Sequence, residues 1–189
     1  MKKYLLFLLA LPFLWVSCSD DDNSFGIEEL SYDGPNEAAP ILPLGTFEAA
    51  ARFPASITSD YSGRSLDVVQ FYLENVPLRT WVKVYGDGGN NAPGTLLYER
   101  EVTDDVFPFR WNSHSLDIPV TINGDDLWIA IVVEHENGNY GSIGCDPGPA
   151  TSNGDWFLDV DFTTNWETFR NFTNNAVSIN WNIRGELTN

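Results

Sequence analysis

Few residues of this chain could act as nucleophiles or bases. The 189-residue sequence has two histidines, His114 and His135, and only one cysteine away from the N-terminus, Cys145. His135 is followed by glutamate, as in the helical zinc-protease motif, but Asn139 stands where the second histidine belongs and the segment is expected to be a strand. An unpaired cysteine is more often a small apolar core residue than a nucleophile, so we expect Cys145 to be buried and not to act with His135 as its base. We predict no catalytic residue, and a hydrolase site in loop 137–155 is the alternative.

Three loops are rich in oxygen ligands: Asp87–Asn91, Asn123–Asp126 and Asp146–Asp155. Calcium binds carboxylate, amide and carbonyl oxygens together, although none of these loops has EF-hand spacing. The same residue types also form turns and supply solubilising charge. If the chain binds calcium, we expect a structural ion with Asp146 and Asp155 among its ligands.

An aromatic strip is predicted on two neighbouring strands, 66–73 and 80–86. If their turn is centred between residues 76 and 77, Tyr72 lies opposite Trp81 and Gln70 opposite Lys83, with Tyr85 on the same face. Rings stack on sugars, while an amide and an amine can bond to hydroxyls or carboxylates. The predicted glycan site is Gln70, Tyr72, Trp81, Lys83 and Tyr85. The alternative is that the N-terminal segment or another sheet covers this face.

The chain is strongly acidic, with a formal net charge of −17. Removing Lys2 and Lys3 with a signal peptide leaves eight basic and 27 acidic residues, a net charge of −19, and Lys83 as the one remaining lysine. Such a surface repels nucleic-acid phosphates and anionic lipid headgroups. We therefore expect no nucleic-acid partner, and any membrane attachment must be covalent or hydrophobic.

The N-terminus has the pattern of a lipoprotein signal peptide. A basic start precedes the apolar run Tyr4–Val16, which is too short to span a bilayer and is followed by Ser17-Cys18. This resembles the lipobox of bacterial lipoproteins, although Trp15 replaces the usual leucine. The acidic residues after Cys18 resemble the export signal of Bacteroidota-type surface lipoproteins. The resemblance implies lipidation at Cys18 and an outer-membrane location facing the cell exterior.

The predicted domain organisation follows from composition. Residues 1–17 form the signal peptide. Residues 18–43 form an acidic flexible tether after the acylated cysteine, because residues 19–43 carry seven acids, no bases and three prolines. Residues 44–189 form the globular domain.

This domain is predicted to be an all-β antiparallel sandwich of about eight or nine strands. The apolar, β-branched run Leu127–Val133 has the composition of a central strand buried on both faces. Turn residues separate the remaining runs at hairpin spacing, with no convincing helix. The expected strands are Thr46–Phe53, Leu66–Leu73, Thr80–Gly86, Leu96–Val102, Phe109–Ile118, Leu127–Val133, Trp156–Val160, Trp166–Phe169 and Ser178–Leu187.

Several short motifs resemble a jelly-roll module that is appended to secreted peptidases and surface proteins of Bacteroidota-type bacteria, loosely similar to gingipain adhesin domains. They are Val84–Gly86, Pro93–Glu99, Asp126–Ile129, Cys145–Ala150, Gly154–Trp156 and Asn180–Gly185. The resemblance implies a β-sandwich with an extracellular accessory role, and it supplies no ligand or catalytic residue. We expect a surface lipoprotein with a non-catalytic binding or adhesion module for glycan or extracellular protein. A structural subunit of an envelope assembly is a further alternative.

Overall fold

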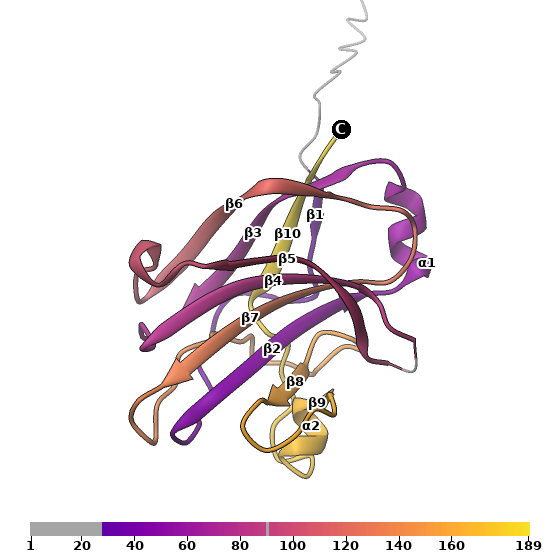
Figure 1. The fold of residues 1–189 in the computed structure, drawn as a ribbon. Helices are drawn as coiled ribbons and strands as arrows, with labels where there is room; N and C mark the ends of the chain where they lie inside the picture. Colours follow the sequence, from indigo (N-terminus) through magenta and orange to yellow (C-terminus); the bar gives the residue numbers. More distant parts are fainter. Residues whose placement is uncertain (1–27, 90) are drawn as a thin grey trace, which may run out of the picture.

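Two antiparallel sheets packed face to face form the fold of this protein. The computed structural model describes residues 28–89 and 91–189, and Figure 1 shows their path. One sheet has the order β1-β10-β3-β6 and the other β5-β4-β7-β2-β8-β9. The predicted all-β antiparallel sandwich is therefore confirmed.

Nine of the strands in the described residues coincide with expected runs, whereas β1 was not predicted and β10 starts five residues later than expected. Their bounds are β1 Glu28–Leu30, β2 Gly45–Phe53, β3 Ser65–Leu73, β4 Arg79–Asp87, β5 Pro93–Glu101, β6 Arg110–Thr121, β7 Leu127–His135, β8 Trp156–Asp159, β9 Glu167–Thr168 and β10 Ile183–Thr188. Short helical turns are α1 Ala55–Thr58, η1 Ser59–Tyr61, η2 Thr103–Asp105 and α2 Phe169–Phe172. The expected strand Trp166–Phe169 is shorter than predicted, because the Thr168 side chain accepts a hydrogen bond from the Asn171 amide and starts α2.

The chain folds as one long antiparallel hairpin whose paired strands are divided between the two sheets. β4 pairs with β5, β3 with β6, and β2 with β7, so the pairs are nested around the β4–β5 turn. Successive pairs alternate between the sheets, as in a jelly roll. This wrapping brings the β4–β5 hairpin close to the end of β6 and the start of β7.

β7 is buried on both faces, as its composition predicts. Ile129 and Ile131 belong to the main core between the sheets and have no exposed surface. On the outer face, Trp128 and Ala130 form a second cluster with Trp156 and others. The tilted Trp128 and Trp156 rings have centroids 5.0 Å apart, so aromatic side chains of the same sheet cover this outer face.

The predicted tether, residues 18–43, is wrong from residue 28 onward. β1 pairs with β10, and Leu30 and Leu42 are buried in the core. The buried Asp33 carboxylate receives the Arg184 guanidinium, with Nη2 and Oδ2 3.0 Å apart. Arg64 and Arg184, which are distant in the chain, thus pair with three of the acids that favoured a tether, Glu28, Glu29 and Asp33. The sandwich begins by Glu28 instead of Leu44. Residues 1–27, including the expected signal peptide and Cys18, lie outside the described residues.

The described residues contain no helix with the length and apolar character needed to cross a membrane.

Candidate binding cleft

The predicted aromatic strip is divided between the two sheets. β3 pairs with β10 and β6, whereas β4 pairs with β5 and β7. The connection between β3 and β4 crosses from one sheet to the other instead of turning as a hairpin. The predicted pairing of Tyr72 with Trp81 and of Gln70 with Lys83 is therefore wrong.

Gln70 and Tyr72 lie on the four-stranded sheet and make contacts within it. The Gln70 amide donates to the Glu186 carboxylate across the β3–β10 pair. The Tyr72 ring meets the Trp111 ring edge-on at 6.0 Å. The Arg184 guanidinium lies 4.2 Å from the centroid of the same Trp111 ring.

Trp81, Lys83 and Tyr85 share the outer face of β4, as their alternation predicts. Two of them, Lys83 and Tyr85, contact the buried carboxylate of Glu48. The Tyr85 hydroxyl donates to Glu48 Oε1 at 2.7 Å, and Lys83 Nζ lies 3.9 Å from Glu48 Oε2. Burial raises the pKa of the Glu48 carboxyl, although Lys83 and Tyr85 oppose this effect. The Lys83 ammonium and the Tyr85 hydroxyl therefore already have a partner on a neighbouring strand of the same sheet. A sugar-binding role for Trp81, Lys83 and Tyr85 stays a prediction.

Asp146 accepts hydrogen bonds from four protein donors. Its Oδ1 receives the amides of Gly148 and Asn180 at 2.9 and 2.8 Å. Its Oδ2 receives the Gly34 amide and Asn180 Nδ2 at 3.1 and 2.9 Å. Burial alone would raise the pKa of the Asp146 carboxyl, but these hydrogen bonds outweigh burial and lower the pKa.

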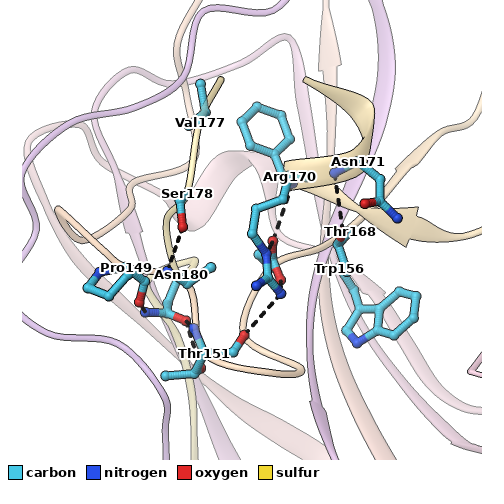
Figure 2. Close-up of polar contacts among 12 residues, drawn as sticks. Pro149, Thr151, Trp156, Thr168, Arg170, Asn171, Val177, Ser178 and Asn180 are labelled. Atoms are coloured by element: carbon cyan, nitrogen blue, oxygen red, sulfur yellow. Dashed lines mark hydrogen bonds and ion pairs between the residues drawn. The ribbon is translucent and has the colours of Figure 1, made fainter. Parts of the chain in front are cut away.

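Asp155 is completely buried and holds the Arg170 guanidinium. Arg170 Nε and Nη2 donate to its two carboxylate oxygens at 2.8 and 3.0 Å. In Figure 2, Thr151 lies between Asn180 and Arg170, and both of them bond to it. Through these contacts, Asp146 and Asp155 stabilise the conformation of loop 146–155. Calcium binding by them stays a prediction to which the geometry adds no support, since no group of three or more acidic, histidine or cysteine side chains in the described residues could hold a metal.

His135 and Cys145, which the hydrolase alternative would use, have separate surroundings. His135 Nε2 lies 2.7 Å from Ser142 Oγ, and both residues are almost fully buried. Burial raises the pKa of the Cys145 thiol to about 12, so the thiol is protonated at neutral pH. No described contact joins His135, Cys145 and an acid into one site.

The described residues do form a cleft at one end of the sandwich, with a volume of about 420 Å³. It lies where the β4–β5 hairpin meets the end of β6 and the β6–β7 loop. Its walls combine apolar side chains with hydroxyl, amide and carboxylate groups, and the volume is within the usual range for small-ligand sites. The lining residues are Gly86, Asp87, Thr95, Leu97, Ile118, Pro119, Val120, Thr121, Asn123, Asp125, Asp126 and Leu127.

On one side of the cleft, two glycines allow the two strands of the β4–β5 hairpin to approach closely next to its loop. A Cβ atom on Gly94 would lie 2.1 Å from the Asp87 carbonyl oxygen, and one on Gly88 would lie 2.5 Å from the Pro93 carbonyl oxygen. Only residues without a side chain permit this approach. Asp87 is thereby held at the cleft, with its Oδ1 accepting the Gly89 amide at 2.7 Å.

The β6–β7 loop, on the other side, is attached to the segment that follows β2. The Thr58 hydroxyl donates to the Asp125 carbonyl at 2.7 Å. Asp126 accepts the Ala55 amide at 2.8 Å and forms an ion pair with Arg52 whose Nη2–Oδ2 distance is 2.6 Å. Arg52 also donates to Asn91 in the β4–β5 loop, so one guanidinium connects this loop to the β6–β7 loop.

The cleft was only partly visible in the sequence. Two of the three oxygen-rich loops, Asp87–Asn91 and Asn123–Asp126, were singled out, but as separate calcium candidates. The apolar wall residues Leu97 and Ile118 were not, because each belongs to an expected strand. Their exposed fractions, 47% and 74%, mark them as surface residues only once the fold is known.

No protein-family model, curated protein or solved structure matches this chain, so no enzyme family is found for it.

Proposed function

We propose that this protein is an outer-membrane-anchored surface lipoprotein whose β-sandwich is a non-catalytic binding or adhesion module for glycans. The observation that carries the binding role is the cleft of about 420 Å³ at the end of the sandwich. Its position on loops held by a rigid β-framework is typical of binding sites. The anchor is supported by the Ser17-Cys18 pattern at the end of an apolar segment.

A glycan suits the cleft because of its mixed walls. Leu97, Ile118 and Leu127 offer apolar surface to the carbon–hydrogen faces of a sugar ring. Thr95, Thr121 and Asn123 carry hydroxyl and amide groups that both donate and accept hydrogen bonds, as sugar hydroxyls require.

The binding proposal is tested by blocking the cleft. Thr121 is exposed on its wall, and Thr121→Trp should fill the space and abolish retention of the full-length protein on glycan arrays and in affinity electrophoresis. Thr164→Trp, at an exposed position outside the cleft, is the matched control. Unchanged retention of the Thr121 variant would refute the cleft as the glycan site.

The anchor is tested separately at the proposed lipidation site. Cys18→Ala should leave an unacylated precursor that no longer partitions into the detergent phase. A variant that is processed and partitions like the unaltered protein would show that Cys18 does not carry the lipid.

A further inference from the structure

The cleft has an unbalanced charge. Three of its lining residues are aspartates, and of the described lining residues none is basic. Arg52 neutralises Asp126 through the ion pair described above. Asp87 and Asp125 are exposed and form no ion pair among the described residues.

The two unneutralised carboxylates come from opposite walls. Asp87 ends β4 on the hairpin side, and Asp125 lies in the β6–β7 loop. A concave site lined with one sign of charge concentrates ligands of the opposite sign.

The ligand that these features describe carries a protonated amine on a polyhydroxylated ring. An alkylammonium chain alone would satisfy the carboxylates, but it would make no use of the Thr95 and Thr121 hydroxyls or of the Asn123 amide, whose oxygen accepts the Asp125 amide. A bare metal ion would need closely clustered ligands, and the described residues hold no such group. A sugar ring with an ammonium substituent uses the apolar, hydroxyl and carboxylate parts of the cleft together.

We propose that the cleft selects glycans that contain unacetylated amino sugars, with Asp87 and Asp125 as the groups that recognise the ammonium. This inference rests on the proposed glycan-binding function and names its ligand class. It also accounts for how a strongly acidic protein can bind a polysaccharide selectively, because neutral glycans can form only hydrogen bonds with the two carboxylates and acidic glycans are repelled by them.

The test compares three tetramers that share one linkage and differ at one carbon of each ring: those of glucosamine, N-acetylglucosamine and glucose. Their affinities for the purified full-length protein are measured by isothermal titration calorimetry at physiological salt. We expect the glucosamine tetramer to bind about five- to tenfold more tightly than the other two. Asp125→Asn and Asp87→Asn should each reduce this preference, whereas Asp104→Asn, an exposed aspartate in η2, should preserve it.

The outcomes separate the inference from the function on which it rests. Equal binding of all three tetramers, with loss in Thr121→Trp, would overturn amino-sugar selection and leave glycan binding intact. If Asp104→Asn lowers the preference for the glucosamine tetramer as much as Asp125→Asn does, the preference reflects general attraction to an acidic protein. That result would also overturn amino-sugar selection by the cleft. If tetralysine binds as tightly as the glucosamine tetramer and its binding depends equally on Asp125, the ligand of the cleft is a basic peptide and the amino-sugar proposal is overturned. Binding of no glycan at all would refute both proposals.

Discussion

The Arg52 guanidinium and the Asp126 carboxylate form the ion pair around which the loops at one end of the sandwich are arranged, with Nη2 and Oδ2 2.6 Å apart. Arg52 also bonds to Asn91, and its backbone amide donates to the Asn153 carbonyl at 2.9 Å. All three oxygen-rich loops of the sequence therefore contact this one residue. The pair both shapes the cleft and removes one of its negative charges.

Arg52→Ala should destabilise the protein by about 2–4 kcal/mol, because it leaves the largely buried Asp126 carboxylate without its partner. Urea denaturation monitored by tryptophan fluorescence measures the loss. Arg100→Ala is the control, since its pair with Asp117 is exposed and should contribute less than about 1 kcal/mol. Similar losses in the two variants would show that the Arg52 pair has no special role.

The central strand gives a second prediction. Ile129→Ala and Ile131→Ala should each cost about 2–5 kcal/mol, because both side chains are fully buried between the sheets. Ile118→Ala, at a 74% exposed position, should change the free energy of unfolding by less than about 0.5 kcal/mol. Losses at Ile129 or Ile131 as small as that of Ile118 would contradict the core position of β7.

The N-terminal segment should contribute strongly to the stability of the fold. A chain beginning at Leu44 lacks β1, leaves the β10 edge unpaired and loses the burial of Leu30 and Leu42. Each of those two leucines contributes about 1.5–3 kcal/mol, a large part of a typical domain stability of about 5–15 kcal/mol.

Circular dichroism and thermal unfolding should therefore show a much lower Tm for the chain beginning at Leu44 than for one beginning at Glu28. The same Tm for both would mean that residues 28–43 merely rest on the sandwich, as a tether would.

Acid should weaken the fold through His135 and His114. Burial lowers the pKa of both imidazoles from the ordinary value of 6.5. As the pH falls through 6.5 the unfolded chain takes up protons that the folded protein does not, so the free energy of unfolding falls. Well above 6.5 the imidazoles are neutral in both states and this effect is absent.

Each histidine can contribute a slope of up to about 1.4 kcal/mol per pH unit within this window. His135→Gln should flatten the decrease between about pH 7.5 and 5.5, as measured by urea denaturation at each pH. A slope identical to that of the unaltered protein would show that His135 titrates normally in the folded state.

Strand positions were predictable because the signals for them are local. The alternation in Ser65–Leu73 and Arg79–Asp87, and the continuous apolar run of β7, depend only on neighbouring residues. The burial of β7 on both faces follows from the same run, since a strand with no polar side needs cover on each face. The oxygen-rich loops were visible for the same reason.

Sheet membership was decided only by the tertiary structure. The residues between β3 and β4 could turn as a hairpin or cross to the other sheet, and the difference lies in distant partners: Leu73 bridges to Ile143, while β4 pairs with β7. That choice separated Gln70 and Tyr72 from Trp81, Lys83 and Tyr85.

The N-terminal boundary and the cleft were decided in the same way. Asp33 and Arg184 are 151 residues apart in the chain, so the acidic composition around Asp33 could not reveal the buried ion pair that fixes it. Likewise, Asp87 and Asp125 lie in different loops, and only the wrapping of the nested strand pairs makes them walls of one cleft. Local sequence determined the elements of this protein, and contacts between residues far apart in the chain determined which of them meet.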